Sequence, residues 1–79
     1  MRLTAVFARN LRFLRHRAGL TQERLAELTG LDRNYIGKLE REENSPTVDR
    51  LEGLAAALQI DAELLIRRNL PTMLSVDSR

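Results

Sequence analysis

Residues 20–41 read LTQERLAELTGLDRNYIGKLER, and this stretch decides the fold. It contains two short runs with helical periodicity, separated by a single glycine. Thr21 is placed to cap the first run, in which Leu25 and Leu28 fall on one face. Gly30 is free to adopt a positive φ angle and so to reverse the chain at little steric cost. The first run is therefore expected to be a helix that ends at this glycine.

The second run begins after Asp32, which is a good N-cap residue. Two helices this short and this tightly joined cannot lie antiparallel, so we expect them to cross steeply, as in a helix-turn-helix. The apolar residues of the second run recur at helical spacing, at Leu31, at Tyr35 or Ile36, and at Leu39. Four residues are then left on the outer face of the second helix: Arg33, Asn34, Gly37 and Lys38.

The outer residues of the second helix have the chemistry needed to read DNA bases. Arginine and lysine donate to O6 and N7 of guanine, asparagine bonds the adenine edge, and Tyr35 can pack on a thymine methyl group. Gly37 costs about 1 kcal/mol relative to alanine in a helix interior, and we expect it to let the helix backbone approach a base pair closely. The alternative is a solvated polar face, which is the default for polar residues on a helix.

Length and composition limit the classes of protein that fit. A chain of 79 residues is one domain, and 43% hydrophobic residues with 4% aromatic predict a leucine-rich helical core. There is no cysteine, and the single histidine, His16, has no visible set of partner ligands. No glycine-rich phosphate loop is present either. We therefore expect a protein that is not an enzyme and has no metal site and no cofactor.

Charge is distributed unevenly along the chain. Residues 1–41 hold nine Arg/Lys against four Asp/Glu, while residues 42–79 hold four against seven. This asymmetry favours one face for a polyanion and another for a different partner. No apolar run has the length of a membrane span, and charge interrupts the N-terminal residues too early for a signal peptide. We expect a cytoplasmic protein with no membrane partner.

The remaining helices are predicted from periodicity and capping residues. Thr4 is a candidate cap for a first helix that ends at Gly19, and Thr47 and Asp61 cap two later helices. Pro71 closes the last of these helices. The expected helices span about 4–18, 22–29, 33–41, 48–58 and 62–69.

This sequence resembles the phage-repressor (Xre/Cro-type) helix-turn-helix family. The likeness covers about residues 8–66 and rests on Gly19 to Ala26, Gly30, Ile36, Leu39 to Arg41, Pro46, Thr47, Leu51 and Leu54 to Leu58. It implies an all-α, compact five-helix, lambda-repressor-like DNA-binding domain over residues 1–70, followed by a C-terminal tail over residues 71–79.

The resemblance also implies roles for individual residues. Arg15 and Glu40 match an inward-facing ion pair between the first and third helices of the family. The expected base contacts are Arg33, Asn34, Lys38 and Tyr35. The expected DNA phosphate contacts are Thr21, Gln22, Asn44, Ser45 and Thr47.

Within the family, Leu31 to Ile36 resembles the recognition helix of controller proteins of restriction-modification systems, which are stand-alone dimeric domains. Gly37 and Lys38 depart from that pattern, because controllers more often have a small polar residue followed by glycine. The expected function is a sequence-specific transcriptional regulator that binds a palindromic operator as a homodimer. The alternative is an antitoxin that binds both DNA and a toxin protein.

Apolar residues near the C-terminus exceed what a core this small needs. Such a surplus usually marks a protein interface, so we expect a two-fold dimer through the last helix and the tail. In such a dimer two recognition helices would lie roughly 34 Å apart, in successive major grooves. The alternative is a frayed tail with Leu64 and Leu65 folded into the monomer core. The expected interface residues are Leu64, Leu65, Ile66, Leu70, Met73, Leu74 and Val76.

Overall fold

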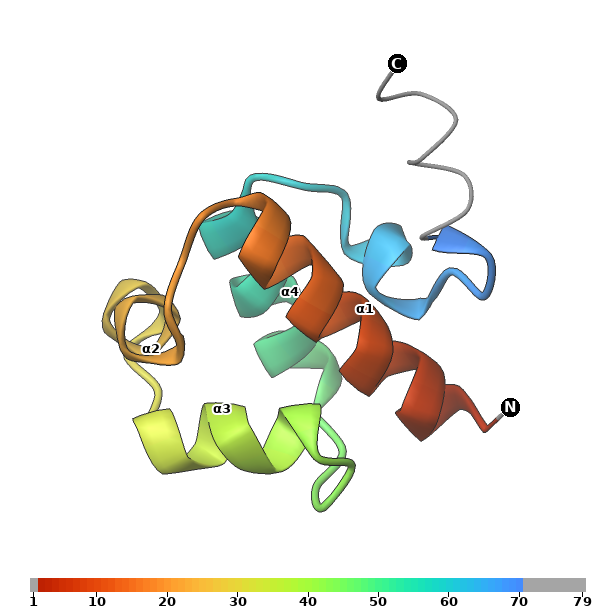
Figure 1. Ribbon diagram of the computed structural model, residues 1–79, viewed down its shortest axis with the longest axis horizontal. Helices are drawn as coiled ribbons and strands as arrows, with labels where there is room; N and C mark the ends of the chain where they lie inside the picture. The colour runs from red at the N-terminus through yellow and green to blue at the C-terminus, as the bar shows by residue number, and fades with distance from the viewer. Residues whose placement is uncertain (1, 71–79) are drawn as a thin grey trace.

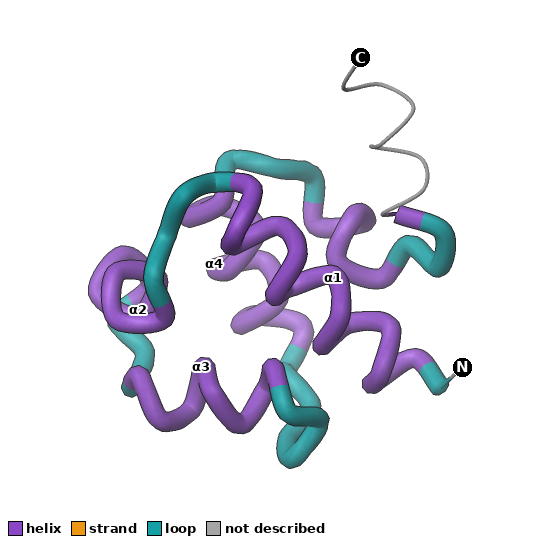
Figure 2. The backbone as a smooth tube through the Cα atoms, viewed as in Figure 1, coloured by secondary structure: helices purple, strands orange, loops and turns teal. Residues whose placement is uncertain are grey.

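The computed structural model describes residues 2–70. Its helices are α1 (Leu3–Arg17), α2 (Gln22–Thr29), α3 (Arg33–Glu40), α4 (Val48–Leu58) and the short 3-10 helix η1 (Ala62–Ile66). In Figure 1, α1 crosses the middle of the molecule, with α2 at the left, α3 below it and η1 on its other side. Helices and loops account for the whole described backbone, in which no strand occurs (Figure 2).

The predicted fifth α-helix over 62–69 is wrong, because this segment forms only the 3-10 helix η1 before the chain turns. The physical reason lies in α1. The fully buried side chain of Asn10 donates from Nδ2 to three backbone carbonyl oxygens near the end of η1. These bonds tie the segment to α1 where it leaves helical geometry: the Leu64 carbonyl also accepts the N–H of Arg67 at 3.3 Å, a three-residue step, and the Arg67 backbone is extended. The three acceptors belong to Leu64, Leu65 and Arg67, at 3.1, 3.3 and 2.7 Å.

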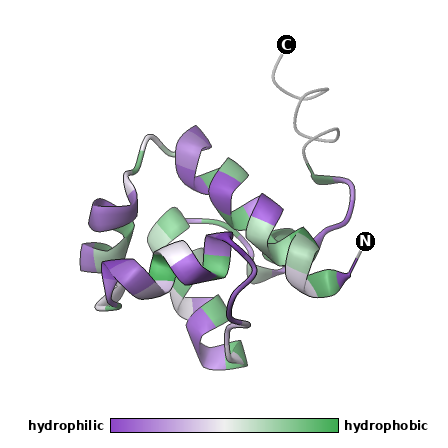
Figure 3. Cartoon of the chain, turned by 60° about the horizontal axis from the view of Figure 1, so that its bottom comes forward, coloured by the Kyte–Doolittle hydropathy of each residue, from purple (hydrophilic) through white to green (hydrophobic). Residues whose placement is uncertain are grey.

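Leucine residues dominate the core, as the composition predicts. α1 packs against α3 and η1, while α2 packs against α3 and α4. Hydrophobic and hydrophilic residues alternate along the helices in Figure 3, as amphipathic helices around one core require. Leu28 is an exception to the predicted apolar face of its helix, since it is 45% exposed, and Val48 at the start of α4 is 76% exposed. The large fully buried side chains are Phe7, Leu11, Leu25, Ile36, Leu39, Leu54, Leu65 and Leu70.

Side-chain caps begin α2, α3, α4 and η1 at the predicted residues. The side chains of Thr21, Asp32, Thr47 and Asp61 each accept a hydrogen bond from a backbone N–H of the following turn. The prediction for Thr4 is wrong. α1 begins after Arg2 without a side-chain cap, and the Thr4 hydroxyl instead lies 3.4 Å from the hydroxyl of Ser45. α1 and α3 each end one residue earlier than predicted, at Arg17 and Glu40.

Left-handed residues follow the helices and reverse the chain. Gly19 and Gly30 both have φ = 73°, as expected from the sequence. Glu42 and Gln59 occupy the same region with φ of 65° and 58°, although neither is a glycine. Since side chains with a Cβ atom rarely adopt this conformation, the turn after α3 carries backbone strain.

Candidate nucleic-acid interface

α2 and α3 form the steep crossing that the sequence predicts. In Figure 1, α2 is viewed nearly along its axis, while α3 lies across the picture. Gly30 makes this turn possible, and the N–H of Leu31 donates to the carbonyl of Ala26 at 3.1 Å to close it. Asp32 then starts α3 by accepting the N–H of Asn34 at 2.7 Å. The result is a short rigid unit in which the start of α3 is fixed by backbone geometry.

A buried polar network joins α1, α2 and α3. Arg15 and Glu40 form an ion pair with a 2.6 Å Nε–Oε2 distance, and their side chains are only 10% and 4% exposed. This is the pair that the family resemblance implies. Gln22, the first residue of α2, donates from Nε2 to Oε1 of Glu40 at 3.0 Å. Because these groups satisfy one another, the orientation of α3 relative to α1 and α2 is specified by hydrogen bonds as well as by packing.

The outer face of α3 carries most of the residues expected to read bases. Arg33, Asn34 and Lys38 are all exposed. Arg33 also forms an ion pair with Glu23 of α2, with 3.2 Å between Nε and Oε2. Surface pairs of this kind contribute little to stability, so a stronger partner can replace Glu23. The three side chains are therefore available to a ligand on one face of α3.

Tyr35 lies at the edge of this face. It is half-buried and packs against the core next to Ile36, which is fully buried. The guanidinium carbon of Arg50, from α4, lies 4.8 Å from the centre of its ring. This cation–π contact and the packing against the core both restrict the motion of the ring.

Gly37 does not leave an open approach to the helix backbone. It is buried, because the guanidinium group of Arg41 covers it. Our expectation that this glycine admits a base pair therefore conflicts with a side chain that already fills the space. Arg41 extends past the end of α3 and folds back along the outer face.

The pair formed by Arg41 and Glu43 was not predicted from the sequence. Arg41 donates from Nε to Oε2 of Glu43 at 2.8 Å. The pKa of Glu43 lies below its ordinary value, mainly because of this hydrogen bond. The positive charges of Arg41 and Lys38 also lower it. The only sequence signal was opposite charge two residues apart in a turn, which is too common to single out a site.

The residues expected at phosphates lie at the starts of α2 and α4 and in the turn before α4. Thr21 and Thr47 use a hydroxyl lone pair to cap these helices, accepting N–H groups at 3.0 and 3.1 Å. A hydroxyl that accepts in this way keeps its own hydrogen to donate. Asn44 and Ser45 are exposed in the turn. All four therefore have a donor available at the surface.

Two residues expected at a dimer interface lie inside the monomer. Leu65 and Leu70 are fully buried, so they offer no surface to a second copy. Ile66 is 39% exposed, and Leu64 is half-buried. Three more expected interface residues, Met73, Leu74 and Val76, lie outside the described residues.

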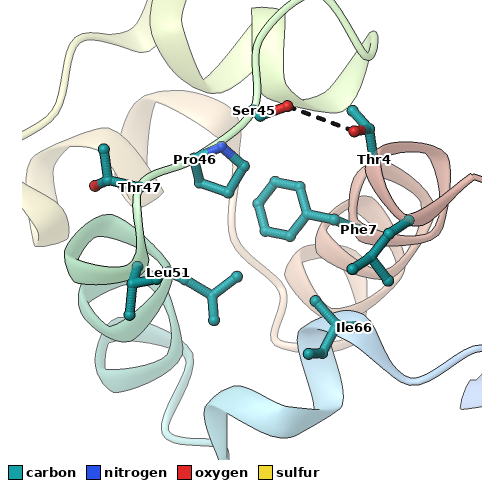
Figure 4. Close-up of a pocket in the computed structure, with 9 residues that line it drawn as sticks. Thr4, Phe7, Ser45, Pro46, Thr47, Leu51 and Ile66 are labelled. Carbon is teal, nitrogen blue, oxygen red and sulfur yellow. Dashed lines mark hydrogen bonds between the residues drawn. The ribbon is translucent and has the colours of Figure 1, made fainter.

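An apolar groove of about 270 Å³ opens next to Ile66. Figure 4 shows Phe7, Pro46 and Leu51 around it, with the contact between Ser45 and Thr4 at its rim. Within residues 2–70, three of the four exposed large hydrophobic side chains line this groove: Leu3 (48%), Val48 (76%) and Ile66 (39%). Exposed apolar surface is thus concentrated where α1, η1 and the start of α4 meet.

The fold and this surface define a helix-turn-helix protein. A helix-turn-helix family model matches residues 11–65, which is more than half of the chain. The chain belongs to this family. Residues 2–70 contain no group of side chains that could hold a metal ion, and none of their helices has the length and apolar character of a membrane span.

Several known proteins are similar along most of the chain. Control protein C.SmaI of Serratia marcescens is 41% identical over 68 residues, which cover 86% of this chain and 81% of that protein. The crystal structure of the restriction-modification controller protein C.AhdI from Aeromonas hydrophila has 42% identity and a TM-score of 0.76, covering 78% of this chain and 94% of that one. The hypothetical transcription factor NHTF from Neisseria has 35% identity and a TM-score of 0.85, covering 94% and 85%.

Proposed function

We propose that this protein is a sequence-specific DNA-binding transcriptional regulator. The observation that carries the proposal is the exposed set of Arg33, Asn34 and Lys38 on α3, a helix whose orientation is fixed by a buried ion pair. A helix presented in this way fits the major groove, where donor and acceptor patterns distinguish all four base pairs. Membership of the helix-turn-helix family and similarity to named regulators support the same function.

Two groups of residues contact DNA in this proposal, one at the phosphates and one at the base edges. Donors at Thr21, Gln22 and the turn over residues 44–47 contact phosphates and set the register of the protein on the duplex. Arg33, Asn34, Lys38 and the outer edge of Tyr35 contact base edges and supply specificity. The arginine-rich N-terminal half adds salt-dependent attraction to any DNA.

A second copy of this chain occupies the apolar groove in our proposal. Ile66, one of the residues expected at the dimer interface, lines the groove together with Leu3 and the exposed Val48. The groove also adjoins Ser45 and Thr47 in the turn that we assign to the DNA backbone. We further propose that the two-fold axis passes beside this turn and runs so that both copies of α3 face the same side of the dimer, as a palindromic operator requires.

A controller of a restriction-modification system is the specific role that similarity supports. C.AhdI is a restriction-modification controller protein, and C.SmaI is a control protein. Gly37 and Lys38 depart from the usual controller pattern, so the operator is expected to differ. Within residues 2–70, no observed contact supports the alternative that the protein is an antitoxin.

The test combines sedimentation with sequence selection. Random-sequence duplexes are enriched by repeated binding to the purified protein, and the complex is weighed by analytical ultracentrifugation. We expect two copies of the chain on a palindrome whose half-sites lie about one helical turn apart. Binding that enriches no sequence would overturn the proposed function, and one copy on an asymmetric site would overturn the dimer.

A further inference from the structure

The space over Gly37 is occupied by an arginine. A Cβ atom added at this position would lie 2.9 Å from Nη1 of Arg41, and the three nearest atoms all belong to that guanidinium group. Real Cβ atoms essentially never approach so closely. Glycine is disfavoured in a helix interior, so its presence here calls for a local reason. The contact with Arg41 is one such reason, since a Cβ atom here would require the guanidinium group to shift, although the end of a flexible side chain can do so at little cost.

The turn after α3 holds the same guanidinium group from the other side. Glu43 accepts from Nε of Arg41 at 2.8 Å and from Nη2 at 3.5 Å. Glu43 is brought there by Glu42, whose left-handed backbone, with φ of 65°, turns the chain back. The N–H of Glu43 then donates to the carbonyl of Lys38 at 2.8 Å. A strained residue and an ion pair together therefore set the position of one side chain on the outer face.

We propose that Arg41, laid across α3 over Gly37 and held by Glu43, is a further specificity-determining residue that reads a guanine edge. This inference rests on the proposed function and adds to it a contact that the family resemblance did not assign. Arg41 lies on the same ridge of α3 as Arg33, because positions 33, 37 and 41 are successive steps of four residues. Its guanidinium group is thus on the face already assigned to DNA.

The geometry of the pair explains why a base edge is the expected ligand. Glu43 occupies the Nε side of the guanidinium group, and Nη1 makes no hydrogen bond within residues 2–70. The end formed by Nη1 and Nη2 is left to donate two parallel N–H groups, which match O6 and N7 of guanine. The Glu43 carboxylate also offsets the charge of Arg41. Arg41 therefore adds little to the affinity for unselected DNA. Its main contribution is to sequence preference, through the placement of its N–H groups.

The first test measures discrimination. Binding of the full chain is compared on the selected duplex, on its single-base-pair variants and on an unrelated duplex. Arg41→Ala should remove about 5- to 150-fold of preference at one base pair of each half-site. Arg24→Ala is the matched control, because Arg24 also lies in an exposed ion pair, with Glu27 at 3.0 Å. The control should weaken the selected and unrelated duplexes by the same factor.

The second test is a double-mutant cycle. It asks whether position 37 needs a glycine because of Arg41 or because DNA approaches the helix backbone there. Gly37→Ala should lower the preference at the base pair that Arg41→Ala affects, and it should have no further effect in the Arg41→Ala background. An equal loss in both backgrounds would mean that DNA needs the glycine directly, which would overturn the inference. Thermal melts establish that all variants are folded, and the clash involves only the end of a flexible side chain.

The two proposals fail in different ways. If the unsubstituted protein enriches no sequence, the proposed function itself is wrong. If it enriches a sequence and Arg41→Ala keeps every base preference, only the role of Arg41 is wrong. Loss of affinity by the same factor on all duplexes would identify Arg41 as a phosphate contact and would also overturn its role in specificity.

Discussion

Arg15 and Glu40 form a two-point ion pair that ties α1 to the last residue of α3, with distances of 2.6 Å for Nε–Oε2 and 3.0 Å for Nη2–Oε1. Arg15 is further satisfied by the carbonyl of Leu20, to which Nη1 donates at 2.9 Å. The pair is nearly excluded from water, so each charge depends on the other. Its position makes it part of the frame that orients the recognition helix.

Glu40→Ala should be among the most destabilising single substitutions of a polar residue in α3. It would leave the Arg15 charge buried without its partner, which costs about 3–5 kcal/mol. Urea unfolding followed by circular dichroism measures the loss. Glu27→Ala is the control, because its pair with Arg24 is exposed and should change stability by less than about 1 kcal/mol. Similar midpoints for the two variants would show that the buried pair contributes nothing special.

The pKa of Glu43 should report the contact with Arg41 directly. The hydrogen bond from Arg41 lowers this pKa, so the contact stabilises the turn above the ordinary carboxyl value of 4.5 and is lost as pH falls through the lowered value. Arg41→Ala should raise the pKa of Glu43 toward its ordinary value. A titration of the Glu43 carboxyl carbon by NMR measures both proteins. Identical titration curves would rule out the contact in solution.

The dimer that we propose should dissociate into folded monomers in the Val48→Glu variant. The side chain is 76% exposed in the single chain, so the carboxylate stays in water until a second copy covers it. Burial of an unpaired charge would then oppose association. Sedimentation velocity over a range of concentrations provides the measurement. Leu28→Glu is the control on α2, outside the groove, and should remain dimeric. Dimers of both variants would place the interface elsewhere.

Gln22→Ala should weaken binding to every DNA sequence by a similar factor. The Gln22 amide reaches both the Glu40 network and, in our proposal, a phosphate. Because glutamine carries no charge, its loss releases no counterions and the slope of log affinity against log salt should stay the same. Fluorescence anisotropy at several salt concentrations tests this. A changed preference among duplexes would contradict a phosphate role.

Local signals made the central part of the fold predictable. Thr21, Gly30 and Asp32 each act on a backbone group within three residues, so their effects are visible in sequence alone. The buried ion pair was reached by resemblance, since residues 15 and 40 are far apart along the chain. Spacing alone placed Arg15 only at the edge of an apolar stripe.

Long-range side-chain contacts account for what the sequence did not predict. The η1 segment is tied to α1 by Asn10, which lies more than 50 residues from the carbonyls it binds. Nothing about a single asparagine in α1 indicates that contact. Likewise, the place of Arg41 over Gly37 follows from a left-handed glutamate at position 42, a conformation that propensity argues against.

Arg33→Ala provides the most direct test of the claim that α3 reads DNA sequence. Affinity is measured on the selected duplex and on each of its single-base-pair variants. We predict a loss of about 1–3 kcal/mol that is concentrated at one base pair of each half-site, so the variant no longer distinguishes the bases there. An equal loss on selected and unrelated duplexes would contradict the account, because Arg33 would then contribute only charge.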